Sequence, residues 1–130
     1  MQRLADFHEA FGVQRWIDAN AEERHQMLNL RLRLITEEYQ EVVTEIDLGR
    51  DGKGDIYALA KELADLLVVV YGTAEVLEIP LHAVFNEVMN SNMSKLQDDG
   101  TPLRREDGKI LKGPNYREAD VEQIMTWWAA

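Results

Sequence analysis

The chain of 130 residues contains no cysteine. A disulfide framework, a thiolate metal site and a cysteine nucleophile are therefore all excluded. This composition suits the reducing environment of the cytoplasm, where we expect the protein to reside.

Long hydrophobic runs are also missing. The longest one, residues 66–71, is far shorter than the roughly 20 residues that a membrane-spanning helix needs. No charged segment followed by an apolar one begins the chain, as a secretory signal would. We therefore expect a soluble protein without a membrane partner.

Positive charge is scarce, because 24 acidic residues face 14 lysines and arginines, for a formal net charge of -10. The phosphates of a nucleic-acid polymer would meet an unfavourable field, so we expect no such partner. Acidic residues gathered at one place can instead hold divalent cations.

What the sequence does contain is a hydrophobic fraction of 45%, enough for the core of a single domain over residues 1–130. Apolar residues recur mainly at helical spacing, and no convincing alternating strand is longer than a few residues. Local signals predict four helices. The first ends at Gly12, and the second runs from the N-cap Asn20 to Gly49. The third starts at the N-cap Asp55 and reaches about Leu77, and the fourth begins at Pro80. Short links between them predict an all-α four-helix bundle.

The segment that follows the fourth helix is rich in turn formers and in cations. Asp107-Gly108 lies between short flanks, which predicts a hairpin turn or a mobile basic loop. Residues 117–128 resume helical spacing and predict a short C-terminal helix.

Two groups of carboxylates carry the functional argument. Glu37, Glu38 and Glu41 form one acidic patch along the second helix, which alone would pass as a solvated face. Glu62 and Asp65 differ, because they lie on the apolar stripe of the third helix, where an unpaired charge costs several kcal/mol.

A buried lysine or arginine, for instance Arg31 or Arg33, could neutralise such an acid, but one partner explains two acids poorly. Carboxylates of two antiparallel helices can instead form an oxygen-lined cage, which suits magnesium or manganese; its members would be Glu38, Glu41, Glu62 and Asp65. A di-iron bundle fits less well, since no histidine has the required spacing from either acidic group. Phosphoanhydride hydrolysis is the natural reaction of such a magnesium site.

These motifs resemble a known family. E-E-x-x-E at residues 37–41, followed by E-x-x-D at residues 62–65, is similar to the signature of the all-α nucleotide pyrophosphohydrolases. That superfamily includes MazG, the dimeric dUTPases and phosphoribosyl-ATP pyrophosphohydrolase. The resemblance covers residues 25–117 and includes N-x-x-K at Asn92 and Lys95.

The resemblance implies an enzyme that cleaves a nucleoside triphosphate between the α and β phosphates, giving a monophosphate and pyrophosphate. It implies Mg²⁺, with Mn²⁺ as a substitute, bound by the four carboxylates of the cage. Glu37 and Glu38 would be the catalytic residues that position the attacking water. It also implies a homodimer or homotetramer that removes unwanted nucleotides from the pool.

Within the family the substrate stays open between (d)NTPs, with dUTP among them, and phosphoribosyl-ATP. The residues expected to bind the substrate are Asn92 and Lys95 on the fourth helix, Lys109 and Lys112 in the basic loop, and Tyr116 after it. The alternative from another class is a non-catalytic helical interaction module whose acids only solvate its surface.

Overall fold

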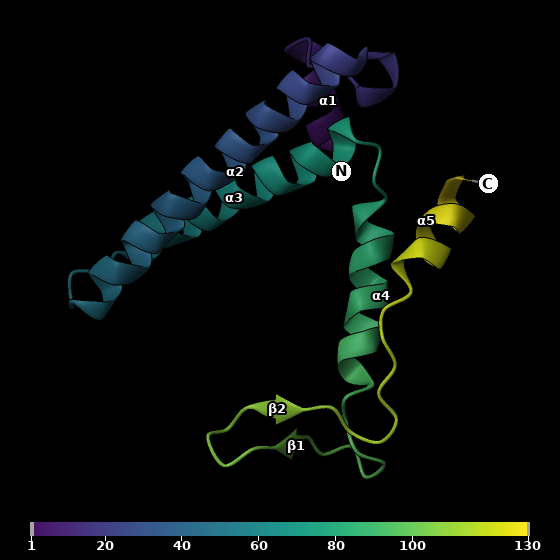
Figure 1. The fold of residues 1–130 in the computed structure, drawn as a ribbon. Helices are drawn as coiled ribbons and strands as arrows, with labels where there is room; N and C mark the ends of the chain where they lie inside the picture. The colour runs from purple at the N-terminus through teal and green to yellow at the C-terminus, as the bar shows by residue number, and fades with distance from the viewer. Residues whose placement is uncertain (1, 130) are drawn as a thin grey trace. The chain divides into compact units, whose positions relative to one another are not determined.

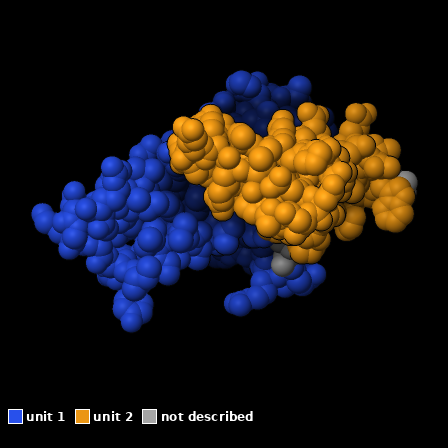
Figure 2. All heavy atoms as spheres, turned by 90° about the horizontal axis from the view of Figure 1, so that it is seen from below, with its two compact units in different colours: residues 1–79 blue, residues 80–130 orange. Residues whose placement is uncertain are grey.

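The computed structural model describes residues 2–129, and the chain divides into two compact units, residues 1–79 and residues 80–130 (Figure 2). Unit 1 contains α1 (Gln2–Ala10), a short 3₁₀ helix (Trp16–Asp18), α2 (Ala21–Arg50) and α3 (Ile56–Val76). Consecutive helices α2 and α3 lie side by side as an antiparallel pair, and α1 packs against α3 (Figure 1).

The ends of the long helices follow the predicted capping residues. Asn20 and Glu23 form a reciprocal capping box at the start of α2, and Asp55 accepts hydrogen bonds from the first backbone amides of α3. Gly12, just after α1, has a φ of +67°, a conformation that glycine adopts without strain. These boundaries are set by local chemistry.

Apolar residues recur along α2 every three or four residues, from Leu28 to Ile46, and this apolar seam is only partly covered. Val42 is buried, whereas Leu32, Tyr39 and Ile46 remain 66%, 54% and 45% exposed. The facing stripe of α3 is better covered, since Val69 and Val76 are buried. The apolar face of α2 is therefore wider than the surface that covers it within the chain.

A buried polar cluster joins the three helices of unit 1. His8 Nδ1 of α1 lies 2.6 Å from Glu75 Oε2 of α3. Arg31 of α2, which is 7% exposed, donates from Nε to Thr73 Oγ1 at 3.0 Å and from Nη2 to the carbonyl of Val69 at 3.1 Å. Burial lowers the pKa of Arg31, and Glu75 partly offsets this effect.

Gly72 gives this cluster its space, because a Cβ there would lie 2.7 Å from Arg31 Nη2 and 3.2 Å from His8 Nε2. We expect Gly72→Ala to lower the free energy of unfolding by about 1–3 kcal/mol through overpacking. Gly49→Ala is the matched control: its Cβ would meet no atom within 4 Å, so a gain of about 0.5–1 kcal/mol is expected. Urea unfolding measures the free energy of unfolding of both variants. An equal increase in the two would contradict the close contact at Gly72.

Unit 2 contains α4 (Leu81–Met93), β1 (Leu103–Arg104), β2 (Ile110–Leu111) and α5 (Val121–Ala129). The two strands pair antiparallel, with Leu103 opposite Leu111. The turn between them places Gly108 at a φ of +88°. Of the two alternatives for the basic segment, the hairpin is confirmed, and so is the short C-terminal helix.

Glu87 of α4 binds the segment that leads into α5. Helix α5 lies beside α4 (Figure 1). Its Oε1 accepts from Arg117 Nη1 at 2.7 Å and from the backbone amide of Asp120 at 3.1 Å. The Arg117 hydrogen bond, followed by the amide, holds the pKa of Glu87 below its ordinary value. The ionised form of Glu87 is therefore the one that stabilises unit 2.

We expect Glu87→Gln to lower the melting temperature at pH 7 and to speed hydrogen exchange at the Asp120 amide. Because the folded pKa of Glu87 is depressed, its contribution is present above the unfolded pKa and disappears as the pH falls through the folded one. The difference between wild type and variant should therefore vanish in acid. Glu118→Gln, at an exposed position nearby, is the control; a pH-independent difference would refute this role of the charge.

Five α-helices, one short 3₁₀ helix and one pair of two-residue strands are the helices and strands of residues 2–129, which confirms the all-α class. No single helix in this range has the length and hydropathy to span a membrane; α3 and α4 meet that criterion only as a pair with a break between them.

Candidate metal site

Three of the four predicted metal ligands converge in unit 1. Glu38 comes from α2, while Glu62 and Asp65 lie one turn apart on α3. One carboxylate oxygen from each residue lies within 4.8 Å of the others. The antiparallel pairing of α2 and α3 thus joins two motifs that are separated by twenty residues of chain.

The three carboxylates are partly withdrawn from water. The side chain of Glu62 is 13% exposed and that of Asp65 is 37% exposed. Burial raises the pKa of Glu38, and the negative charges of Asp65, Glu62 and Glu41 raise it further. A cluster of this kind is stable only if positive charge lies close to it.

Lys61 supplies positive charge at this place. Its Nζ lies 2.9 Å from Asp65 Oδ2 and 3.3 Å from Glu62 Oε1. Hydrogen bonds to these two carboxylates, Asp65 first, raise the pKa of Lys61. The sequence motifs did not single out Lys61, although its spacing of four residues from Asp65 is the one that brings side chains together on a helix. The expectation that one partner explains two acids poorly is wrong here, because this single ammonium reaches both.

The alternative that an arginine neutralises these acids is wrong for Arg31, which donates instead to Val69 and Thr73, one and two turns beyond Asp65 on α3. Arg33 is exposed, and none of the ion pairs found in residues 2–129 includes it. The positive charge comes from α3, the helix of Glu62 and Asp65, and not from α2.

Glu37 and Glu41 lie outside the converging group. Both are exposed on α2, and Glu41 is close enough to raise the pKa of Glu38. The roles of Glu37 in catalysis and of Glu41 in metal binding stay predictions. Glu45, one turn further along, is half-buried and has no assigned role.

The donor set fits a hard divalent cation. All three converging groups are carboxylates, and oxygen ligands are those that Mg²⁺ and Mn²⁺ prefer. The group contains no histidine, which a di-iron site of the bundle type would require. The residues present therefore match the predicted cofactor in ligand chemistry.

The five predicted substrate-binding residues all belong to unit 2. Asn92 is exposed in the last turn of α4, which ends at Met93. Lys95 therefore lies beyond the helix and not, as the sequence had predicted, on it, although its amide still donates to the carbonyl of Asn92 at 3.2 Å. The carbonyl of Lys95 accepts from the amide of Gly113, at 3.0 Å.

That hydrogen bond ties Lys95 to the segment that contains two other predicted residues. The Nζ of Lys112 lies 4.7 Å from the centroid of the Tyr116 ring, in a cation–π contact. Lys109 is exposed next to the hairpin turn. A role of these residues in binding substrate stays a prediction.

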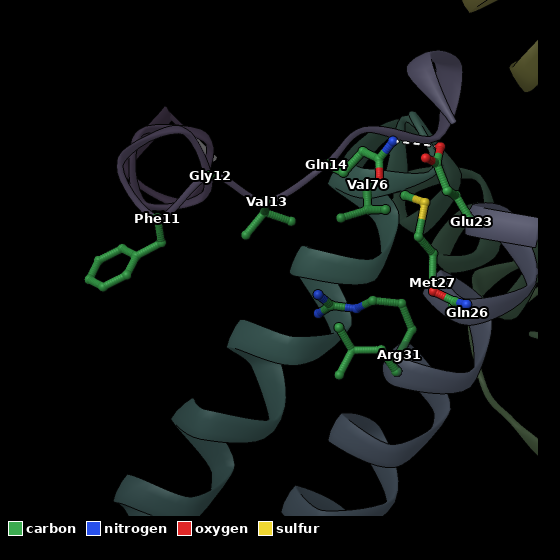
Figure 3. A pocket seen from close by; sticks show the side chains of 10 residues that line it. Phe11, Gly12, Val13, Gln14, Glu23, Gln26, Met27, Arg31 and Val76 are labelled. Carbon is green, nitrogen blue, oxygen red and sulfur yellow. Dashed lines mark hydrogen bonds between the residues drawn. The ribbon is translucent and has the colours of Figure 1, made fainter. Parts of the chain in front are cut away.

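A cavity of about 380 Å³ lies in unit 1, where the loop after α1 meets α2 and the end of α3 (Figure 3). Met27 and Val76 contribute apolar walls, and the guanidinium of Arg31 reaches its floor. At the rim, Gln14 Nε2 donates to Glu23 Oε2 at 2.9 Å. No motif in the sequence predicts this cavity, because its residues come from three separate segments.

The fold and the carboxylate cluster together define a class: all-α proteins in which carboxylates of two antiparallel helices converge and could hold a metal ion. Residues 26–99 match the family model of the MazG nucleotide pyrophosphohydrolase domain, which is more than half of the chain. The protein belongs to this family, and its membership implies nucleotide pyrophosphohydrolase activity in general. A search of curated proteins found no match.

We expect Mg²⁺ or Mn²⁺ to raise the melting temperature of the wild type, because a ligand of the folded state stabilises it by about 2.7 kcal/mol at 100 times its Kd. Glu62→Gln should abolish the shift by removing the most buried ligand of the cluster. Glu45→Gln, on the same helix pair, should keep it. Differential scanning fluorimetry with and without chelator measures the shift, and equal shifts in all three proteins would contradict the site.

Proposed function

We propose that the protein is a magnesium-dependent nucleoside triphosphate pyrophosphohydrolase, which cleaves the α–β phosphoanhydride to a nucleoside monophosphate and pyrophosphate. The observation that carries this proposal is the convergence of Glu38, Glu62 and Asp65 across α2 and α3. Membership in the MazG family supports the reaction class.

The carboxylates of the cluster would hold the cation, with Glu41 beside them. When bound, a divalent cation supplies neutralisation of phosphate charge and lowers the pKa of water. Glu38, whose pKa is raised, or the exposed Glu37 would accept the proton of the attacking water. The water oxygen bonds to phosphorus, the bridging P–O bond breaks, and pyrophosphate leaves.

The cavity beside Arg31 offers a place for the base. Arg31 precedes Glu38 by seven residues on α2, which corresponds to roughly 10 Å along the helix. A nucleotide carries its base and its outer phosphates at opposite ends, so this separation suits one substrate that reaches both places. Apolar walls with a few polar groups are typical of small-molecule pockets.

The residues of unit 2 complete the proposal. Lys109 and Lys112 would bind the outer phosphates as cations, together with Lys95, while Asn92 and Tyr116 would contact the sugar or the base. We also propose a cytoplasmic homodimer or homotetramer. Its support is the uncovered apolar surface, such as Leu32 on α2, Leu67 on α3 (53% exposed) and Trp127 on α5 (85% exposed).

The decisive experiment incubates the purified full chain with Mg²⁺ or Mn²⁺ and a panel of nucleotides: the common (d)NTPs, dUTP and phosphoribosyl-ATP. Anion-exchange chromatography should show a monophosphate and pyrophosphate. Glu62→Gln should lower the rate about 100-fold or more, since it removes a ligand of the cation on which several kcal/mol of transition-state stabilisation depend. Glu45→Gln should retain the wild-type rate.

Each other outcome has a distinct meaning. Turnover of phosphoribosyl-ATP alone would replace the (d)NTP assignment by the alternative within the family. Orthophosphate as the only product, or no turnover of any nucleotide, would overturn the enzyme assignment. No turnover together with a melting temperature indifferent to metal would support the non-catalytic helical module.

A further inference from the structure

Lys61 is the cation in direct contact with the predicted metal ligands, and its placement points to a role beyond an ordinary surface ion pair. We propose that Lys61 is the resident counter-cation of the metal site. It holds the carboxylates together while the site is free of metal, and it leaves them when a divalent cation binds. The proposal rests on the metal site of the proposed function, but not on its catalysis.

The geometry gives the first argument. The ammonium group contacts Asp65 at 2.9 Å and Glu62 at 3.3 Å, so it bridges two of the three converging carboxylates. One ammonium therefore offsets part of the repulsion between these two carboxylates.

The order of the residues along α3 gives the second argument. An ion pair between residues four apart on one helix stabilises the helix more when the acid precedes the base. Here the base, Lys61, precedes Asp65. A pair in the reverse order adds little to the stability of a helix. The contact is better explained by the need of the acidic cluster for positive charge than by helix stabilisation.

Exposure shows why the contact can be given up. The side chain of Lys61 is 70% exposed, whereas that of Glu62 is 13% exposed, so the ammonium approaches the cluster from the solvent side. A divalent cation among the same oxygens would repel it strongly at this distance. The flexible lysine stem can then turn into water. Arg31, which is buried and hydrogen-bonded to α3, has no such freedom.

A direct test measures the Kd of Mn²⁺ for the full chain by electron paramagnetic resonance of the free ion. If the metal must displace the ammonium, Lys61→Met should bind Mn²⁺ about threefold to fivefold more tightly than the wild type, the range expected for loss of an exposed ion pair. Lys61→Arg, which keeps the charge, should stay close to wild type.

Lys53→Met is the matched control for net charge. Lys53 lies in the exposed loop between α2 and α3, and none of the ion pairs in the described part of the chain includes it. Because solvent and salt screen distant charges, its removal should leave the Kd unchanged. Equal tightening in Lys53→Met and Lys61→Met would overturn the proposal in favour of a general charge effect.

A second measurement uses the wild type and needs no variant to fold. An amine-reactive reagent labels the protein with and without Mn²⁺, and mass spectrometry gives the ratio of Lys61 to Lys53 labelling. We expect Mn²⁺ to raise this ratio, because the lysine loses its carboxylate partners. An unchanged ratio would overturn the proposal.

The outcomes separate this inference from the proposed function. Mn²⁺ binding with the expected effects at Lys61, but without pyrophosphate release, would sustain the counter-cation and defeat the enzyme assignment. Pyrophosphate release by the wild type, with an unaltered Kd for Mn²⁺ in Lys61→Met, would sustain the enzyme assignment and defeat the counter-cation proposal. A wild type that binds no Mn²⁺ would end the counter-cation proposal as well.

Discussion

The mutual repulsion of three carboxylates is the constraint on which the functional part of this structure depends. Glu38, Glu62 and Asp65 are held together by two long antiparallel helices, although their charges favour separation. The helices supply the necessary rigidity through their apolar contact, in which Val42 and Val69 are buried. The arrangement consequently needs positive charge, from a lysine or from a metal ion.

Two polar clusters on the same helix pair illustrate opposite solutions to the cost of burying charge. Around Arg31 the guanidinium bonds to Thr73 and to the Val69 carbonyl, and His8 pairs with Glu75, so the partners lie within the protein. Such a cluster fixes how the helices pack. The carboxylate cluster lacks partners of comparable burial, which leaves it able to take up a cation.

Much of the fold could be predicted from the sequence because the decisive signals are local. The capping box at Asn20, the cap at Asp55 and the turn at Gly108 each act within a few residues, and the structure contains all three. The convergence of Glu38 with Glu62 could also be foreseen. Motif spacing and the antiparallel pairing of neighbouring helices are enough to place them together.

The sequence by itself thus determined the helices, the all-α class and the acids that meet across α2 and α3. The tertiary structure alone decided that Arg31 serves α3 packing, that Lys61 turns toward the acids and that Lys95 bonds to the segment at Gly113. It also decided that much of the α2 seam stays uncovered. The physical reason is that caps and periodicity act within a few residues, whereas the partner of a long charged side chain depends on which surfaces the folded helices bring within its reach.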